Sequence, residues 1–597
     1  MASFRDATDH VGFFRAASLA NLEEKQMMTV HGADRPVLLC WHEGQVFALD
    51  NRCPHMGFPL SKGSLNRGLL TCHWHHARFD LRSGCAFDLW ADDTPMFEVC
   101  VEGDDIWVSK VPLRRADAVF HSARLHRGLE QNIGLVQAKN IVALLAGGQG
   151  AKSVIREIVK FGARHHRVWG DGMTMLSLVA RLSPRLEETT LVYALAAAAR
   201  RVASNCAGQP MRHSPGRLNG EGYDEKRLSE WMFHWAKVRH DEAAERTLLT
   251  AVACGPTKEA LNRMVFGPIQ ERIYADGGHA LDLSNKAFEL LEFIGWEYAT
   301  EVLPLIVEHL TQSRSEEEKG TWRAPVDLVE LIQAAEEALR KNSPRTRGGA
   351  MCKPDFYSHV LGENPQAIIR AVVEAVNNGV PPVEVARHLT LAAAWRLARF
   401  PESNDIEDWF APMHTFSFCN ALHRVLARGG TSSELVRGLF HAAMSIYVDR
   451  FLNIPGAQLP SEQPLENLPT GADELRETIL SALDQRKVWS EVPRLVLRYL
   501  RLGHPEARLI DTLAFATVRE TFIVCRLSKP VLPRRKNGRQ PVPSANCSIR
   551  QSAVTLLLIA RHDAVQASRS RSPCACTRGK KFTPSKLRLE VFTLRYN

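Results

Sequence analysis

The chain of 597 residues is 45% hydrophobic and 24% charged, which is typical of soluble globular proteins, and its length predicts about three to five domains. Its net charge of +9 comes from its C-terminal end, because residues 521–597 carry 16 basic and two acidic side chains, whereas the preceding 520 residues carry 59 basic and 64 acidic ones. This distribution excludes overall charge as an argument for nucleic-acid binding, and the chain has no run of about 20 apolar residues that would predict a membrane-spanning helix.

The cysteines and the N-terminal residues favour a reducing compartment. Thirteen cysteines are scattered along the chain, which fits reduced thiols better than a framework of disulfides. The first residues, Met1 to Asp6, contain no apolar signal region. We therefore expect a cytoplasmic protein with neither a membrane nor a nucleic acid as a partner.

Residues 1–112 alternate apolar and polar side chains in short runs, as half-buried strands do. The segments Val37–Trp41 and Val46–Leu49 flank Glu43-Gly44, which predicts a hairpin. We expect a small all-β domain over residues 1–112.

Two mixed pairs of cysteine and histidine are the most informative residues of this domain. They are Cys53-Pro54-His55 and, after 16 intervening residues, Cys72-His73-Trp74-His75. This C-x-H and C-x-x-H pattern resembles the Rieske signature. The resemblance implies one [2Fe–2S] cluster, with two thiolates on one iron and two imidazoles on the other. It gives Cys53 and Cys72 to the first iron, and His55 and His75 to the second.

A tetrahedral zinc site is the alternative for these four ligands, but a zinc finger usually groups its ligands as a cysteine pair and a histidine pair. His73 and His76 flank the second pair, and the family spacing selects His75 over both. Cys85 and Cys100 have no partner at motif spacing and are expected to be ordinary buried thiols.

The residues around the motif predict a low reduction potential. Some high-potential Rieske proteins carry two further cysteines that form a disulfide over the cluster, whereas this chain has Phe58 and Trp74 at those places. Those proteins also place a hydroxyl behind the second histidine, where this chain has Ala77. Hydrogen bonds to sulfur raise the potential, so their absence favours the lower end of the Rieske range, roughly −150 mV.

After a short linker at residues 113–130, the pattern becomes helical, and we expect an all-α body over residues 131–520. The strongest helical segments are Glu188–Ala203, Asp241–Ala253, Lys286–Phe293, Thr300–Leu310, Val326–Arg340, Ala367–Val376, Pro382–Ala398 and Ser433–Tyr447. A weak internal repeat is also present, since His279 and His414 each begin a His-x5-Asn pattern that follows a pair of predicted helices. The body is therefore expected to consist of two repeated halves.

Three patterns in the helical part resemble parts of metal or catalytic sites. His121 and His126 have the spacing of part of a mononuclear iron site, but Asp117 stands one residue too far away, so we interpret this segment as a linker helix. The pairs Glu230/His234 and Glu384/His388 lie at i, i+4, a spacing more typical of surface contacts than of a di-iron site. If the repeat is real, His279 and His414 face one cavity together with Asn285 and Asn420; the alternative is that these side chains cap helices or satisfy buried carbonyls.

Residues 521–597 lose helical periodicity and are rich in basic residues and proline, which predicts a disordered tail, either a basic arm or residues translated in a shifted frame.

These features predict a redox protein in which a low-potential Rieske cluster transfers single electrons as part of an oxidoreductase. The expected partners are a redox protein, either a reductase or an acceptor, and a small-molecule substrate. The alternative is a non-catalytic electron-transfer module whose helical body docks a partner protein.

Overall fold

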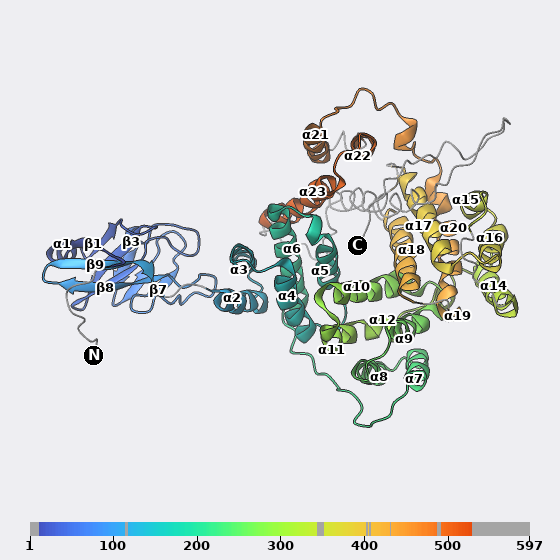
Figure 1. Cartoon of the computed structure of the whole chain (residues 1–597), viewed down its shortest axis with the longest axis horizontal. Helices are drawn as coiled ribbons and strands as arrows, with labels where there is room; N and C mark the ends of the chain where they lie inside the picture. The colour runs from blue at the N-terminus through green and yellow to red at the C-terminus, as the bar shows by residue number, and fades with distance from the viewer. Residues whose placement is uncertain are drawn as a thin grey trace, which may run out of the picture. The chain divides into compact units, whose positions relative to one another are not determined.

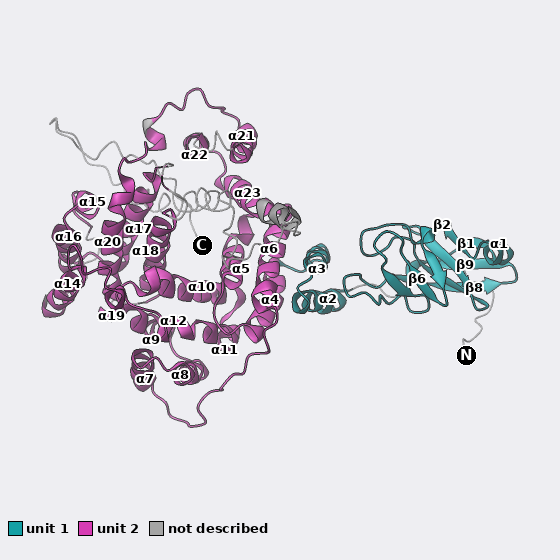
Figure 2. Ribbon diagram, turned by 180° about the vertical axis from the view of Figure 1, so that it is seen from behind, with its two compact units in different colours: residues 1–150 teal, residues 151–597 magenta. Residues whose placement is uncertain are grey.

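The computed structural model describes residues 11–113, 117–342, 351–401, 404, 408–429, 432–485 and 491–527. The chain divides into two compact units, residues 1–150 and residues 151–597 (Figure 2). The first unit contains all the strands of the described residues and the second is helical (Figure 1). This confirms the predicted fold class of a small β-rich domain followed by a large all-α body.

The β domain consists of two antiparallel sheets. A six-stranded sheet has the order β1-β9-β8-β4-β3-β2, and a three-stranded sheet has the order β5-β6-β7. The strands are β1 (Phe13–Ser18), β2 (Met27–Val30), β3 (Val37–His42), β4 (Gln45–Asp50), β5 (Ser64–Asn66), β6 (Leu69–Thr71), β7 (Arg78–Asp80), β8 (Met96–Glu102) and β9 (Asp105–Pro112). A short helix, α1 (Leu19–Lys25), connects β1 to β2.

The predicted hairpin is confirmed. Strands β3 and β4 pair from Val37 opposite Asp50 to His42 opposite Gln45. The two residues between the strands, Glu43 and Gly44, have φ angles of 51° and 74°. Two left-handed residues in a row are what a tight two-residue hairpin requires, and glycine adopts that conformation without strain.

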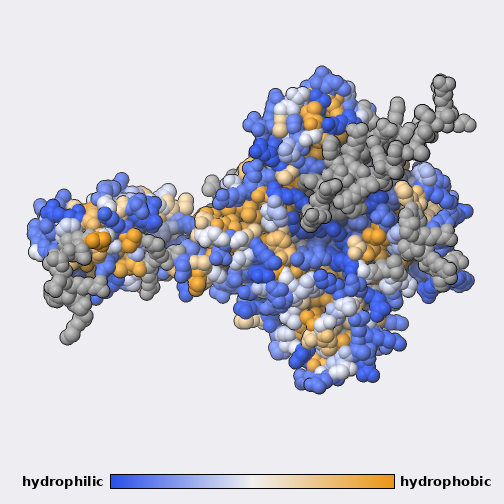
Figure 3. Space-filling model, viewed as in Figure 1, coloured by the Kyte–Doolittle hydropathy of each residue, from blue (hydrophilic) through white to orange (hydrophobic). Residues whose placement is uncertain are grey.

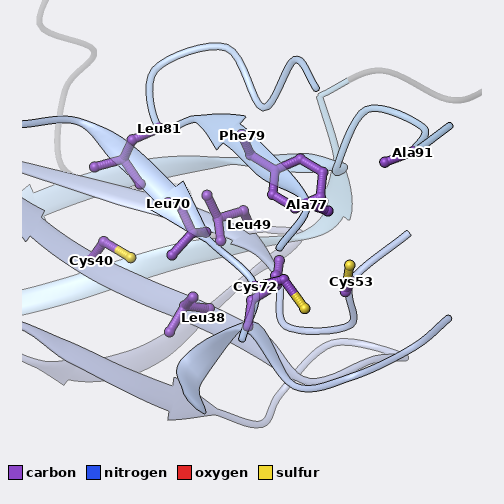
Figure 4. Packing of buried hydrophobic residues seen from close by; sticks show 11 residues of the cluster. Leu38, Cys40, Leu49, Cys53, Leu70, Cys72, Ala77, Phe79, Leu81 and Ala91 are labelled. Carbon is purple, nitrogen blue, oxygen red and sulfur yellow. The ribbon is translucent and has the colours of Figure 1, made fainter. Parts of the chain in front are cut away.

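The β domain has two separate apolar cores. One lies against β1, β2, β8 and β9 and includes Val37, Leu39 and Val108. The other contains Leu38, Leu49, Leu70 and Phe79 together with the motif cysteines (Figure 4). Because neighbouring side chains of a strand point to opposite faces, Leu38 and Leu39 of β3 belong to different cores.

Two helices, α2 (Ala118–Glu130) and α3 (Gly134–Ala146), belong to the first unit. They lie side by side (Figures 1 and 2), and Gln137 on α3 donates a hydrogen bond to the carbonyl of Gly128 on α2 at 2.9 Å. The boundary between the compact units thus falls at residue 150, whereas the sequence predicts a linker over 113–130 and the start of the helical body at 131.

The second unit is built from helices of very different lengths. They are α4 (Ala151–His165), α5 (Asp171–Leu182), α6 (Glu188–Cys206), α7 (Glu225–Lys237), α8 (Asp241–Ala253), α9 (Lys258–Gln270), α10 (His279–Ile294), α11 (Ala299–Val302), α12 (Val307–Thr311), α13 (Glu316–Lys319), α14 (Leu328–Asn342), α15 (Phe356–Val360), α16 (Pro365–Asn377), α17 (Pro382–Ala398), α18 (Phe410–Gly429), α19 (Ser433–Val436), α20 (Gly438–Val448), α21 (Ala472–Asp484), α22 (Val492–Arg501) and α23 (Glu506–Leu527).

Most predicted helices are present, and two are interrupted. The predicted helix 300–310 is divided into α11, a 3-10 turn over Leu303–Ile306 and α12, because Pro304 cannot donate the backbone hydrogen bond that a continuous α-helix needs. The predicted helix 433–447 is divided into α19 and α20 at Arg437. The two halves of the predicted repeat correspond to α8–α10 and α16–α18, and the repeat itself stays a prediction.

Helix α23 continues to Leu527, beyond the predicted end of the body at 520. The rest of the predicted tail, residues 528–597, lies outside the described residues. Among the residues that the structure describes, no helix combines the length and the apolarity needed to cross a membrane. The surface seen in Figure 3 is mostly hydrophilic, with apolar side chains in scattered groups.

Candidate metal centre

Two loops with matching backbone geometry carry the motif residues. The first loop, Cys53–Phe58, follows β4, and the second loop, Cys72–Ala77, connects β6 to β7. In each loop the cysteine N–H donates to the carbonyl of the residue five positions later, from Cys53 to Phe58 and from Cys72 to Ala77, both at 2.8 Å.

The same position of each loop is left-handed. Gly57 has a φ of 80° and His76 a φ of 63°, and each stands four residues after its cysteine. Glycine adopts this conformation at low cost, and histidine is one of the few other residues found in it several times more often than average. The left-handed backbone of His76 therefore gives this residue a role in the turn of the loop. This role accounts for a histidine beside the motif without making it a ligand.

The two cysteines lie at the edge of the apolar core, on neighbouring loops (Figure 4). Cys53 is 3% exposed and Cys72 is 1% exposed, and both are free thiols. Burial raises the pKa of the Cys53 thiol to about 11, and the adjacent Cys72 adds to this rise. The backbone N–H groups of His55 and Met56 act in the opposite direction, because they donate hydrogen bonds to the sulfur and favour its thiolate form.

The two motif imidazoles also lie together. The ring centroids of His55 and His75 are 4.7 Å apart at an interplanar angle of 88°, and those of His55 and Trp90 are 4.6 Å apart. His55 Nδ1 is buried and has no hydrogen-bond partner among the described residues. A buried ring nitrogen without a partner is costly unless it binds something that the protein chain does not itself supply, such as a metal.

This arrangement fits a two-iron cluster. One pair of thiols and one pair of imidazoles lie on the same two loops, as the ligand division of a [2Fe–2S] centre with two histidines requires. In the described part of the chain, no three His, Cys, Asp or Glu side chains are gathered so that they could hold a single metal ion.

The residues on which the predicted low potential rests belong to the two loops. Phe58 and Trp74 face each other across the two loops, with ring centroids 5.8 Å apart. Ala77 is fully buried. Cys85 and Cys100, in contrast, are exposed, so the expectation that they are buried thiols is wrong. Cys85 lies in the connection after β7, and Cys100 lies on the strand β8.

One residue next to the motif was missed by sequence reasoning. The ammonium group of Lys139, on α3, donates hydrogen bonds to the carbonyl oxygens of Pro54 and, at 2.5 Å, His55. Lys139 lies 84 residues after His55, and no local pattern marks it, because a lysine on a helix is ordinarily a surface residue.

The near-miss motifs of the helical part have other roles. Asp117 is the N-cap of α2 and accepts a hydrogen bond from the Phe120 N–H at 2.8 Å, while His121 bonds to Asn140 at 2.9 Å. The Glu384 carboxylate pairs with Arg387 at 2.9 Å, and His388 bonds to the Tyr357 hydroxyl at 2.5 Å.

The second unit does bring His279 and His414 together. Their ring centroids are 4.2 Å apart at an angle of 64°, and the backbone carbonyl of Asp276 is 2.7 Å from His279 Nδ1. Burial, with a smaller contribution from His279, lowers the pKa of His414 to about 4. Asn285 does not join the pair through its amide, which bonds to Glu289 and Arg428.

Comparison with known proteins finds similarity in the β domain. The model of the Rieske [2Fe-2S] domain matches residues 12–97. The ferredoxin component of biphenyl 2,3-dioxygenase from Rhodococcus jostii (strain RHA1) is 33% identical over 96 residues, which are 16% of this chain and 89% of that protein. Apoptosis-inducing factor 3 from Homo sapiens is 31% identical over 135 residues, which are 22% of each chain, so the match spans about a fifth of that relative.

Among solved structures, the ferredoxin of carbazole 1,9a-dioxygenase from Nocardioides aromaticivorans IC177 is 24% identical. It covers 17% of this chain and 100% of its own, with a TM-score of 0.16.

Proposed function

This chain belongs to the Rieske [2Fe–2S] family through its N-terminal domain, which binds a [2Fe–2S] cluster, and we propose that its cluster ligands are Cys53, His55, Cys72 and His75. When bound, such a cluster accepts and donates single electrons. The observation that carries the assignment is the geometry of the two loops, which place a pair of buried thiols and a pair of contacting imidazoles together.

The residues of the two loops support a reduction potential at the low end of the Rieske range. Aromatic side chains, Phe58 and Trp74, occupy the two places where a disulfide would otherwise shield the cluster. The residue that follows the histidines of the second loop is Ala77, which is buried and has no hydroxyl. A low potential suits donation of electrons to an oxygen-activating or otherwise strongly oxidising acceptor, and not oxidation of a quinol.

Replacing one proposed ligand tests the assignment. Purified wild-type protein should contain two iron and two acid-labile sulfide per chain, and Cys72→Ser should lose the cluster and its red-brown colour, because a hydroxyl is a poor substitute for a thiolate on iron. The matched control is Cys85→Ser, since Cys85 is an exposed cysteine of the same domain and should keep the cluster. A full Rieske spectrum in Cys72→Ser would refute the assignment.

The role of the helical body is a further part of this proposal. Relatives matched by the β domain include ferredoxin components of dioxygenase systems, whose names imply a separate oxygenase. This chain carries instead a long helical body of its own, so we propose an oxidoreductase in which the cluster receives electrons from a reductase protein and the body takes part in their use on a small-molecule substrate.

One observation favours an enzyme over a docking module. The contact between His279 and His414 places two imidazoles, one of them held neutral by burial, at the same point of the second unit. A neutral buried imidazole can accept a hydrogen bond from a bound molecule, whereas a docking surface has no need of a buried imidazole.

Metal and cofactor analysis of the purified protein distinguishes an enzyme from a non-catalytic docking module. Iron above two per chain, or an organic cofactor that remains with the purified protein, would support the enzyme. Two iron per chain, no organic cofactor and unchanged electron transfer to a purified acceptor in His414→Ala would support the docking module.

A further inference from the structure

The helical hairpin formed by α2 and α3 is attached to the cluster-binding part of the β domain by two buried or half-buried cations. Arg124 on α2 is 8% exposed. Its Nε donates to the Asp92 carboxylate at 2.8 Å, and its Nη2 donates to the Ala91 carbonyl at 3.0 Å. Ala91 is part of the same apolar core as Cys53 and Cys72, so this contact fixes the hairpin beside the motif loops.

Lys139 on α3 provides the second attachment, and it reaches the motif itself. Its ammonium donates to the carbonyl oxygens of Pro54 and His55, two successive residues of the first loop. Two carbonyls that converge on one ammonium fix the direction of the peptide between them, and that peptide joins Pro54 to a proposed ligand. The loop conformation that presents His55 therefore depends on a residue of the helical hairpin.

The ammonium group of Lys139 is also a positive charge held against the loop that carries one proposed ligand of each type, Cys53 and His55. Lys139 is half-buried, and a charge in a partly dehydrated place interacts more strongly with its neighbours than a charge in bulk water.

We propose that Lys139 is a positioning residue that holds the first loop through its two carbonyls and raises the reduction potential of the cluster bound there. This inference rests on the proposed function, because it takes His55 and Cys53 as ligands. Reduction adds one electron and hence one negative charge to the centre, and a nearby cation stabilises the more negative state. Neither role follows from the motif alone, since the motif contains no cation at this place.

The test compares reduction midpoints of the full chain with Lys139→Met and Lys139→Arg. Methionine keeps an unbranched side chain of similar length without the charge, so Lys139→Met should lower the midpoint by an amount that changes the ratio of reduced to oxidised cluster about tenfold, or about 59 mV for a one-electron couple. Lys139→Arg keeps the charge and should stay close to the wild type. Lys110→Met is the matched control, because Lys110 is an exposed lysine of β9 in the same domain, and it should not change the midpoint.

The outcomes separate this inference from the ligand assignment. An unchanged midpoint in Lys139→Met, with the cluster intact, would overturn the inference and leave the assignment standing, whereas a Rieske spectrum in Cys72→Ser would overturn the assignment. If Lys139→Met fails to retain the cluster, Lys139→Gln replaces it, since its amide still donates to a carbonyl without carrying a charge. A lowered midpoint in that variant supports the inference; a wild-type midpoint, or loss of the cluster in all three Lys139 variants, overturns it.

Discussion

Individual side chains of the two motif loops set the properties of the cluster. Ala77 stands behind the proposed ligand His75 and is fully buried, and its carbonyl accepts the Cys72 N–H at 2.8 Å. Its methyl group cannot donate a hydrogen bond to the cluster. A hydroxyl at this position would therefore have the clearest effect on the reduction potential.

Ala77→Ser should raise the midpoint potential if the new hydroxyl reaches a bridging sulfide, because a hydrogen bond to sulfur strengthens as the cluster gains negative charge. Redox titration of the variant and the wild type measures the change. Ala91→Ser is the control, since Ala91 is another buried alanine of the same core. A midpoint that falls, or one that rises equally in both variants, would contradict the hydrogen-bond explanation.

His414 makes the stability of the second unit depend on pH. Burial lowers its pKa to about 4 in the folded protein, against about 6.5 in the unfolded chain. The folded state binds fewer protons between these values, so the contribution of the neutral ring is complete above pH 6.5 and is lost as the pH falls towards 4.

At pH 4 this loss should be on the order of 3 kcal/mol, because each pH unit corresponds to about 1.4 kcal/mol. Urea unfolding of the full chain at pH 7 and pH 4.5 tests it, with His414→Gln expected to lose less stability on acidification than the wild type. His359→Gln, at an exposed histidine, should behave like the wild type. Equal acid sensitivity of all three proteins would count against a neutral, buried His414.

The hairpin of α2 and α3 extends the β domain beyond its strands. It supplies Arg124 to Asp92 and Lys139 to the first loop, and it forms one compact unit with the strands. A cluster-binding domain that ended at Pro112 would expose Asp92 and the carbonyls of Pro54 and His55 without these partners.

A segment of residues 1–150 should therefore be more stable than residues 1–113. We expect a difference of at least about 2 kcal/mol in the free energy of unfolding, the contribution of one hydrogen bond to a charged group, together with slower loss of iron. Urea unfolding and iron release of the two cluster-loaded segments measure this. Equal stability would place the domain boundary at residue 112, where the sequence predicts it.

Features that neighbouring residues determine could be predicted from the sequence, whereas contacts between residues far apart in the chain could not. The β3–β4 hairpin and helices such as α8 and α17 follow from local periodicity and turn residues, and both helices have the predicted bounds. The contact between His279 and His414 agrees with the comparison of two similar patterns, although the repeat on which that comparison depends stays a prediction. Lys139 could not be predicted, because its contacts with the first loop join residues far apart in sequence and depend on how the hairpin packs.

The whole molecule combines a cluster-binding β domain with a long helical body. The predicted cytoplasmic location and the two-fold repeat stay predictions. Since α23 extends to Leu527, a truncation that tests the predicted tail should end at this residue.

Truncation after Leu527 should leave solubility and cluster content unchanged, because the sequence that follows lacks a periodic apolar face to pack against the body. Truncation after Arg519 removes the last turns of α23 and serves as the comparison. Iron content and size-exclusion chromatography of both proteins measure the outcome. Aggregation of the protein that ends at Leu527 would show that the tail belongs to the core.

The central claim is that the two motif loops hold a low-potential Rieske cluster that transfers single electrons. A redox titration of the purified full chain, followed by its visible spectrum, tests this most directly. The account predicts one reversible one-electron transition in the lower part of the Rieske range, near roughly −150 mV. A midpoint near roughly +300 mV, the upper limit of that range, would contradict it and point to quinol-type chemistry.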